Sequence, residues 1–334
     1  SLENIVKLDD PVMKVDKGIK RPNGLEILKV RVPIGVICII YESRPNVTVD
    51  AAALCIKSGN AVVLRGGKEA VNTNKAFVKI IKEALIKNEI SQEIVSYVDD
   101  PERTYIHDLL KAKGLIDLII PRGGASLINF VEENSIIPII KHDKGVCHVY
   151  VDKFADIKKA INIVYNAKVQ RPSVCNAMES LLIHFDIDEA NVRDILKSLS
   201  SAGVELVGCD LIHKIYGIKL ASEDDWYTEY LDLKLSIKIV KSIGEAIEHI
   251  NKYGSHHSDS IITENYSNAT TFVNNIDSAV VYVNASTRFT DGFEFGLGAE
   301  MGISTQKLHC RGPMGLEDLT TYKYIIFGNG QVRA

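Results

Sequence analysis

The sequence predicts an α/β protein with two domains, the first of them an open, doubly wound sheet. Two observations lead to this prediction. The chain has 334 residues, which exceeds one ordinary hydrophobic core and suits two. From residue 34 onward, short apolar runs alternate with longer segments whose apolar residues recur at helical spacing. Such alternation indicates parallel strands joined by helical crossovers.

The elements of the first half follow in regular order. Each expected strand is a run of aliphatic residues, whereas the longest expected helix has apolar residues at 77, 80, 81, 84 and 85, which share one face. Acidic residues and a proline at 99–102 indicate a helix start, and Gly114 indicates its end. Strands are expected at 32–42, 61–66, 93–98 and 116–121, and helices at 47–59, 68–88, 99–114 and 124–134.

The second half repeats the alternation and predicts a second α/β domain. Strands are expected at 146–152, 179–185, 204–208, 235–242, 258–264 and 278–284, and helices at 154–168, 188–200, 244–254 and 265–275. Residues 25–35 and 321–333 are typical of strands without helical partners. They are candidates for edge pairing or subunit contacts, or they simply complete a sheet.

Composition excludes several classes of partner. Lys and Arg number 39 against 43 acidic residues, a formal charge of −4, which argues against non-specific nucleic-acid binding. No apolar run approaches the length of a membrane span, and no signal peptide is visible. The six cysteines show neither a disulfide framework nor zinc spacing. We therefore expect a cytoplasmic protein with reduced thiols.

One cysteine stands in an unusual setting. Cys175 lies in the polar stretch QRPSVCNAMES between an expected helix and an expected strand. Cys310, in KLHCRGP, also has polar, turn-prone neighbours. Core packing is expected for the other four, Cys38, Cys55, Cys147 and Cys209. A loop cysteine alone is weak evidence for catalysis, because reactivity requires an electropositive setting.

Two glycine pairs follow strands of the first domain, where a doubly wound sheet binds its ligand. The first loop is Arg65, Gly66, Gly67 and Lys68, and the second is Pro121, Arg122, Gly123, Gly124, Ala125 and Ser126. Backbone N–H groups at such turns can face a phosphate, and adjacent basic residues add charge for a further phosphate. One loop alone is better explained as a tight turn, whereas two in one sheet favour a nucleotide site. Neither loop is G-x-G-x-x-G, and the first lacks the spacing of a P-loop.

Two further positions have competing interpretations. Asn46 follows a proline at the end of the first strand, where its amide could stabilise an oxyanion or could cap the next helix. The pair His256 and His257 lacks ligands at metal spacing nearby, so solvated loop histidines and no metal site are expected.

Long stretches of the chain resemble the gamma-glutamyl phosphate reductases, also called glutamate-5-semialdehyde dehydrogenases, a divergent branch of the aldehyde dehydrogenase superfamily. The matching stretches are residues 32–70, 116–128, 170–177, 224–240 and 288–324. The resemblance implies an aldehyde-dehydrogenase-like fold with a Rossmann-like cofactor domain, an α/β catalytic domain and a small oligomerisation hairpin. It places the NADP-binding domain at 1–14 and 34–146, the oligomerisation strands at 15–33 and 321–334, and the catalytic domain at 147–320.

The resemblance also implies roles for individual residues. Cys175 occupies the position of the catalytic nucleophile, and Asn46 that of the asparagine in the oxyanion hole. Arg65 stands where the superfamily has a lysine that contacts the adenosine ribose. Residues 121–126 match the loop near the pyrophosphate, and Glu229 matches the glutamate that holds the nicotinamide ribose. Arg171 and nearby backbone amides are expected to favour the thiolate of Cys175.

The chain departs from the superfamily in two places. It begins without Met, and the family normally has more N-terminal helix, so a truncated or processed N-terminus is expected. Hydrolytic members carry a glutamate just before a glycine turn. The equivalent run here, residues 139–152, has His142 and Asp143 but no glutamate.

The resemblance implies NADPH-dependent reduction of L-glutamyl 5-phosphate to L-glutamate 5-semialdehyde in proline biosynthesis, through a thioester on Cys175. The candidates for binding the substrate are Arg44, Arg171, His257 and Arg288. The resemblance also implies that the chain forms a homo-oligomer, either a dimer or a tetramer. It further implies functional coupling to a glutamate 5-kinase. The alternatives are another acylating dehydrogenase of the superfamily, a cysteine acyltransferase or hydrolase, and a non-catalytic nucleotide-binding protein.

Overall fold

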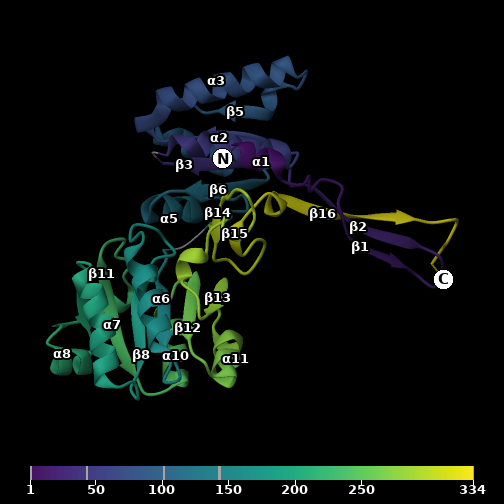
Figure 1. Ribbon diagram of the computed structural model, residues 1–334. Helices are drawn as coiled ribbons and strands as arrows, with labels where there is room; N and C mark the ends of the chain where they lie inside the picture. The colour runs from purple at the N-terminus through teal and green to yellow at the C-terminus, as the bar shows by residue number, and fades with distance from the viewer. Residues whose placement is uncertain (1, 43, 101, 142–143, 334) are drawn as a thin grey trace. The chain divides into compact units, whose positions relative to one another are not determined.

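The computed structural model divides into two units. It describes residues 2–42, 44–100, 102–141 and 144–333. Unit 1 comprises residues 1–142 and 295–334, and unit 2 comprises residues 143–294. Figure 1 shows the elements of both units in chain order by colour.

Unit 1 contains a four-stranded parallel sheet with the order β5-β4-β3-β6. Its strands are β3 (Val36–Tyr41), β4 (Ala61–Arg65), β5 (Val95–Tyr97) and β6 (Leu118–Arg122). Its helices are α1 (Leu2–Lys7), α2 (Pro45–Lys57), α3 (Val71–Lys87), α4 (Arg103–Lys111) and α5 (Ala125–Asn134), with short 3₁₀ helices η1 (Lys68–Ala70), η2 (Gln92–Ile94) and η4 (Glu317–Leu319).

Strand β3 shows why this sheet is covered on both faces. Successive side chains of a strand point to opposite faces. Ile37 and Ile39 pack in the cluster that includes α2 and α3, whereas Cys38 and Ile40 pack in the cluster that includes α4 and α5. A strand buried on both sides reads as a continuous apolar run, as VICIIY does. The predicted doubly wound sheet is therefore confirmed.

Unit 2 contains a seven-stranded parallel sheet with the order β10-β9-β11-β8-β7-β12-β13. Its strands are β7 (Cys147–Val151), β8 (Met178–His184), β9 (Glu205–Gly208), β10 (Lys219–Leu220), β11 (Lys234–Val240), β12 (Ser258–Ile262) and β13 (Val280–Val283). Its helices are α6 (Ile157–Val169), α7 (Glu189–Ser201), α8 (Asp210–Tyr216), α9 (Glu223–Tyr227), α10 (Ile243–Tyr253) and α11 (Tyr266–Asn275), with η3 (Thr287–Phe289). Leu181 and Leu182 of β8 face different clusters, so this sheet too is covered on both faces.

A three-stranded antiparallel arm extends from unit 1 (Figure 1). Its order is β1 (Val15–Lys20), β2 (Glu26–Pro33) and β16 (Thr320–Phe327). The β2–β16 pair runs from Thr320 opposite Pro33 to Phe327 opposite Glu26, so the two segments expected to be strands pair with each other. Unit 1 also holds a two-stranded antiparallel sheet of β14 (Gly302–Ser304) and β15 (Gly312–Met314).

The segment 295–320 differs from its expected place. The resemblance implied that it belongs to the catalytic domain, but the structure places it in unit 1. Met301, Cys310, Met314 and Leu319 are buried in the same cluster as the apolar residues of β3 and α2. The expected polar setting of Cys310 is also wrong, because only 6% of this residue is exposed. The segment has little helical or strand periodicity, so its sequence does not reveal which core it joins.

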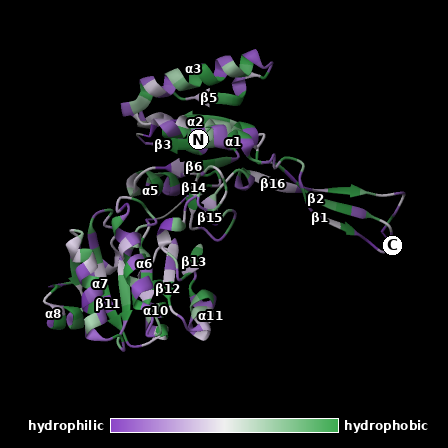
Figure 2. Ribbon diagram, viewed as in Figure 1, coloured by the Kyte–Doolittle hydropathy of each residue, from purple (hydrophilic) through white to green (hydrophobic). Residues whose placement is uncertain are grey.

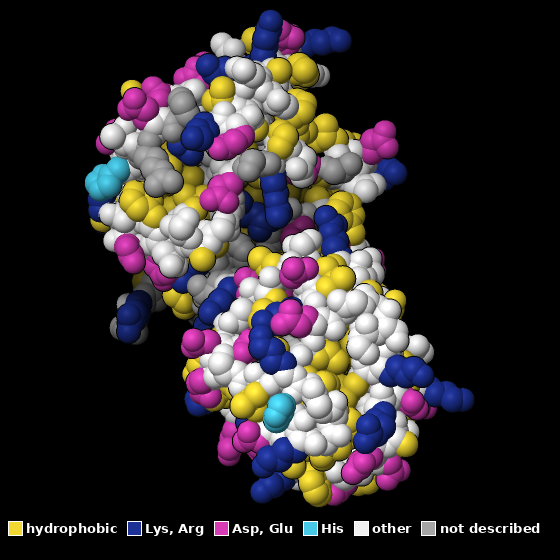
Figure 3. All heavy atoms as spheres, turned by 90° about the vertical axis from the view of Figure 1, so that its left-hand side faces the viewer, with side chains coloured by type: hydrophobic (Ala, Val, Ile, Leu, Met, Phe, Trp, Pro, Cys, Tyr) yellow, Lys and Arg dark blue, Asp and Glu magenta, His cyan; other side chains and the backbone are white. Residues whose placement is uncertain are grey.

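Surface patterning agrees with the expected charge balance. Helix α3 carries polar and apolar residues along its length in Figure 2, as an amphipathic surface helix does. On the face shown in Figure 3, positive and negative side chains are interspersed. Among the described residues, no helix combines the length and apolarity that crossing a membrane requires.

Candidate active site

The loop between α6 and β8 presents Cys175, which is half-buried. Cys147, which starts β7, and Gly145, two residues before it, hold the Cys175 backbone in place. The Cys147 thiol donates a hydrogen bond to the Cys175 carbonyl at 3.2 Å. Gly145 packs so closely on the Cys175 backbone that a Cβ at this position would collide with the Cys175 carbonyl. The nucleophile expected from the sequence therefore lies on a loop whose backbone is held in place.

The other cysteines are less suited to nucleophilic chemistry. Burial raises the pKa of Cys38 and of Cys310 to about 12, and it also raises the pKa values of Cys55 and Cys147. Thiols that stay protonated are poor nucleophiles. Cys209 is half-buried rather than fully buried, and its sulfur accepts a hydrogen bond from the Ile239 N–H. Of the six cysteines, Cys175 therefore has the setting that best suits a nucleophile.

Basic side chains gather at the nucleophile loop. Arg288 of η3 donates from Nε to the Gln170 Oε1 atom at 2.9 Å, and its Nη1 contacts the Asn176 Oδ1 atom. Asn176, next to Cys175, donates in turn to the Thr290 carbonyl at 2.7 Å. Burial lowers the pKa of Arg288, and the nearby positive charge of Arg171 lowers it further. The structure therefore brings together two of the predicted substrate-binding residues, Arg171 and Arg288.

His257 lies elsewhere than predicted. Its side chain is fully buried, with Nδ1 2.9 Å from the Ser258 Oγ atom and 3.6 Å from the Cys147 sulfur. The expectation of a solvated loop histidine is wrong for this residue, because β12 begins directly after it and carries it into the core. A buried imidazole cannot contact a substrate at the surface. His256 is half-buried and its Nδ1 lies 2.7 Å from the Asp277 carbonyl.

One glycine, Gly145, contacts both Glu229 and the nucleophile Cys175. The Gly145 N–H donates to the Glu229 Oε1 atom at 2.8 Å, and Gly145 is the residue packed on Cys175. Burial raises the pKa of the Glu229 carboxyl. The predicted ribose-binding glutamate and the predicted nucleophile are therefore neighbours in unit 2. The preceding residues His142 and Asp143, noted in place of the missing glutamate, lie outside the described residues.

In unit 1 the two glycine loops have different surroundings. Arg65 ends β4 and is 8% exposed, whereas Lys68 is exposed in the short helix η1. A Cβ on Gly66 would collide with the Asn74 side chain and approach Tyr41 within about 3.0 Å, so close packing explains this glycine. Gly67 precedes η1, and the α-helix that follows this loop, α3, begins only at Val71.

The second loop holds an anionic group in this structure. Pro121 and Arg122 end β6, Gly124 is the N-cap of α5, and Ser126 lies exposed in its first turn. The Gly124 N–H donates to the Glu42 carboxylate at 2.9 Å, and Gly123 leaves room for that carboxylate because it lacks a Cβ. A helix N-terminus favours negative charge. Glu42 was not predicted from the sequence, although its place at the end of a strand beside these loops was a signal.

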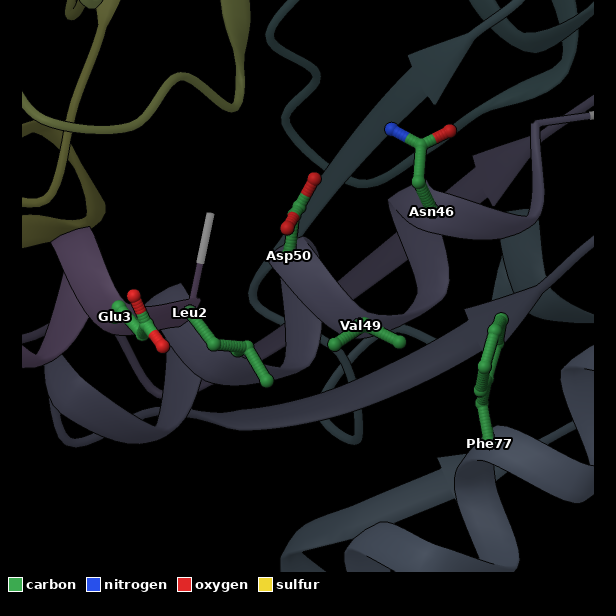
Figure 4. A pocket seen from close by; sticks show the side chains of 6 residues that line it. All are labelled: Leu2, Glu3, Asn46, Val49, Asp50 and Phe77. Atoms are coloured by element: carbon green, nitrogen blue, oxygen red, sulfur yellow. The ribbon is translucent and has the colours of Figure 1, made fainter.

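Asn46 lies in the first turn of α2, whose N-cap is Arg44. The capping interpretation of Asn46 is therefore wrong, because the helix begins one residue earlier, at Pro45. Both Arg44 and Asn46 are exposed. Figure 4 shows Asn46 at the rim of an open hollow of about 510 Å³, which Leu2, Glu3, Val49, Asp50 and Phe77 also line. The oxyanion role of Asn46 stays a prediction.

Comparisons with known proteins agree with this arrangement. The model of the aldehyde dehydrogenase family matches residues 4–206. The chain belongs to the aldehyde dehydrogenase family. Within this family it is 56% identical to the gamma-glutamyl phosphate reductase of Thermodesulfovibrio yellowstonii, over 99% of this chain and 80% of that protein. The corresponding protein of Petrotoga mobilis is 58% identical, with the same coverage of each chain.

Solved structures lead to the same branch of the aldehyde dehydrogenase family. The gamma-glutamyl phosphate reductase of Thermotoga maritima superposes with a TM-score of 0.98 at 51% identity, covering 99% of this chain and 80% of that one. An acetylating aldehyde dehydrogenase of Geobacillus thermoglucosidasius shares the fold with a TM-score of 0.72 at 20% identity, covering 99% of this chain and 82% of that one. The resemblance noted in the sequence and the expected fold class are both confirmed.

Proposed function

We propose that this chain reduces L-glutamyl 5-phosphate to L-glutamate 5-semialdehyde and phosphate, with NADPH as the hydride donor. The relatives at 56% to 58% identity carry the name of that activity. The observation in the structure that supports it best is the setting of Cys175, a half-buried thiol beside Arg171 and Arg288 and joined through Gly145 to Glu229. In this proposal Cys175 is the nucleophile, the two arginines bind the anionic substrate, and Glu229 is the carboxylate that contacts the cofactor.

The first step forms a covalent acyl-enzyme. The Cys175 thiolate attacks the γ-carbonyl of the acyl phosphate, a thioester forms, and phosphate leaves with the electron pair of the broken C–O bond. Arg171 and Arg288 bind the anionic groups of the substrate, which aligns the carbonyl with the sulfur. Asn46 and the Cys175 backbone N–H supply the oxyanion donors in this proposal.

The second step releases the aldehyde. Members of the aldehyde dehydrogenase family use a nicotinamide cofactor, which when bound supplies or accepts a hydride. Glu229 holds the nicotinamide ribose in this proposal, and Arg65 and Lys68 favour the phosphate that distinguishes NADPH from NADH. The thiohemiacetal left on Cys175 after reduction collapses to the aldehyde and restores the thiol.

The cofactor site in unit 1 suits a phosphorylated dinucleotide. At the α5 N-terminus the N–H group of the N-cap Gly124 already binds the Glu42 carboxylate, so this N–H is oriented toward an anion. Arg122 precedes this turn, Arg65 ends β4 and Lys68 follows it, and β3 lies between β4 and β6 in the sheet. These residues fit a pyrophosphate and an additional phosphate at the carboxyl edge of the sheet.

The three-stranded arm is the proposed surface for a homo-oligomer, a dimer or a tetramer. Strand β16 forms one edge of the arm, and Tyr322, Tyr324 and Ile326 are more than half exposed there. Unpaired edges of this kind invite pairing with another chain. A glutamate 5-kinase is the expected functional partner, because an acyl phosphate must be made by phosphoryl transfer. The spacing of the six cysteines suggests no disulfide framework, which favours a reducing compartment such as the cytosol.

The test is an assay in the reverse direction. Glutamate 5-semialdehyde and NADP should give NADPH only when phosphate or arsenate is present, and product analysis should show acyl phosphate formation. No NADPH formation under any phosphate concentration would contradict the proposed function. NADPH formation beyond one turnover without phosphate would instead indicate another dehydrogenase of the family.

A further inference from the structure

A fully buried ion pair lies behind the nucleophile loop. The Lys168 Nζ atom is 2.6 Å from the Glu179 Oε2 atom, and neither side chain is exposed to any extent. Lys168 is in the last turn of α6, and Glu179 is the second residue of β8. The loop that carries Cys175 joins these two elements. The ion pair therefore ties together the two ends of the nucleophile loop.

The same carboxylate also holds a second loop. The Glu179 Oε1 atom accepts a hydrogen bond from the Leu231 N–H at 3.2 Å. Leu231 has a φ of 54°, a left-handed conformation that a leucine rarely adopts without support. The Tyr230 ring lies 5.9 Å from the Lys168 Nζ atom. Lys168 and Glu179 thus contact the loop between α9 and β11 immediately after Glu229.

These contacts close a ring around the candidate site. Glu229 accepts a hydrogen bond from Gly145 at 2.8 Å, and Gly145 packs on the backbone of Cys175. From Cys175 the ring runs through the loop ends to Lys168 and Glu179, then through Leu231 back to Glu229. The nucleophile and the predicted ribose-binding carboxylate are therefore connected by one buried ion pair on one side and by Gly145 on the other.

Stability alone does not explain this pair. Burying two charges costs several kcal/mol per ion in typical proteins, and well-packed apolar residues of similar volume are often as stable or more stable. This cost affects both groups, because burial raises the pKa of Glu179 and lowers the pKa of Lys168 despite their contact. The contacts with two active-site loops suggest a different role.

We propose that Lys168 and Glu179 are positioning residues that hold Cys175 and Glu229 in register for thioester formation and hydride transfer. The inference rests on the proposed functions of Cys175 and Glu229. Neither Lys168 nor Glu179 contacts solvent, so both act through the loops that they hold.

The test replaces the charged pair with an apolar pair of similar volume, Lys168→Met with Glu179→Leu. We expect a melting temperature at least as high as that of the wild type, together with a kcat about tenfold or more lower, because small displacements of reacting groups are costly. The KM for NADPH should rise, because Glu229 loses its support through Leu231. The rate at which iodoacetamide alkylates Cys175 should also fall, measured by peptide mass spectrometry without cofactor or substrate.

A matched control is the exposed pair Lys159 and Glu264, whose charged atoms are 2.8 Å apart on the surface of unit 2. The double change Lys159→Met with Glu264→Leu should leave kcat, KM and alkylation near wild-type values. Wild-type kinetics and alkylation in a stable Lys168→Met/Glu179→Leu enzyme would overturn the positioning role. Absence of NADPH-dependent activity in the wild type would overturn the proposed function instead, and alkylation would still test the pair.

If the double variant does not fold, Glu179→Gln decides the question. Glutamine keeps an oxygen that can accept from the Leu231 N–H but removes the ion pair with Lys168. We expect Cys175 alkylation to slow severalfold while the KM for NADPH stays within about twofold of the wild type. An unchanged alkylation rate in this variant would overturn the proposal.

Discussion

Cys175 differs from the other five cysteines by its surroundings rather than by its chemistry. Its loop is polar and half-exposed, and Arg171 and Arg288 place positive charge beside it, whereas burial keeps Cys38, Cys55, Cys147 and Cys310 protonated. A nucleophilic thiol requires an accessible sulfur and a setting that favours its thiolate. Both conditions meet at this one position among the six.

Cys175→Ser should therefore abolish reduction and leave NADPH binding nearly intact, because only the covalent step is lost. Turnover and cofactor binding measured by fluorescence titration provide the check. Cys209→Ser is the control, since Cys209 is half-buried and far from this loop in sequence. Near-normal turnover of the Cys175→Ser enzyme would exclude the thioester mechanism.

His249 should make unit 2 sensitive to acid. Burial lowers the pKa of His249 to about 2, with smaller effects from His148, Lys238 and Lys252. In the unfolded chain its pKa is near 6.5, so below that pH the unfolded state binds one more proton. Its contribution to stability is present above about pH 6.5 and is lost as the pH falls toward 2.

Between pH 6 and 4, the free energy of unfolding of the His249→Gln protein should depend less steeply on pH than that of the wild type, by up to about 1.4 kcal/mol per pH unit. Urea unfolding of both proteins across this pH range measures the effect. The exposed His213 offers a control, since His213→Gln should leave the slope unchanged. Parallel curves for wild type and His249→Gln would mean that His249 does not titrate between the two states.

Two basic residues at the end of β4 are expected to determine the preference for NADPH over NADH. Lys68 is exposed just after β4, and Arg65 ends that strand. Replacing both with glutamine should raise the KM for NADPH at least about tenfold and change the KM for NADH much less, because one charged phosphate contact is worth roughly 1.5–3 kcal/mol. Lys79→Gln, on exposed α3, is the control. Equal changes for both cofactors would place these residues away from the phosphate.

The arm provides a separate test of assembly. Deleting residues from Tyr322 onward removes most of the β2–β16 pairing and should yield smaller, less stable species in light scattering. A milder change, Tyr324→Lys with Ile326→Lys, puts charge on the exposed edge strand and should also reduce the mass. An unchanged mass for both variants would rule out the arm as the contact surface.

The missing glutamate predicts how the acyl-enzyme is released. Hydrolytic aldehyde dehydrogenases activate water with a positioned carboxylate, and none is present in residues 139–152 apart from Asp143 and Asp152. Asp152 is buried and accepts hydrogen bonds from Tyr150, Thr263 and Asn268. The thioester should then resist water and react with phosphate or hydride.

With glutamate semialdehyde and NADP, we expect at most one turnover without phosphate, measured by stopped-flow absorbance. Added phosphate or arsenate should restore steady turnover. Sustained NADPH formation in phosphate-free buffer, with free glutamate as product, would show that a water-activating base exists.

Much of this molecule could be predicted from periodicity. The strands of both sheets are buried on two faces, so their apolar runs are visible in the sequence. The short helices α8 and α9 were missed because they span fewer than two full turns. Segment 295–320 was assigned to the wrong core because its apolar residues follow neither the helical nor the strand periodicity.

The candidate site was predicted only in part for a related reason. Cys175 was singled out by its polar setting, whereas Glu229 was named from the resemblance and Arg171 and Arg288 as charged partners for the implied substrate. Lys168 and Glu179 were not, since each lies inside a regular element and only folding brings them to 2.6 Å. His257 was misplaced because a histidine pair before a strand does not reveal where burial begins.

The discontinuous make-up of unit 1 has a consequence for synthesis of the chain on the ribosome. Unit 2 is a continuous stretch, so it can complete its core once residue 294 has emerged, as contiguous domains do. Unit 1 emerges first but finishes last, because its core includes Met301, Met314 and Leu319. Until those residues leave the tunnel, apolar faces of α2 and β3 stay uncovered. The nascent chain should therefore bind chaperones through these apolar faces until the segment that completes unit 1 has been synthesised.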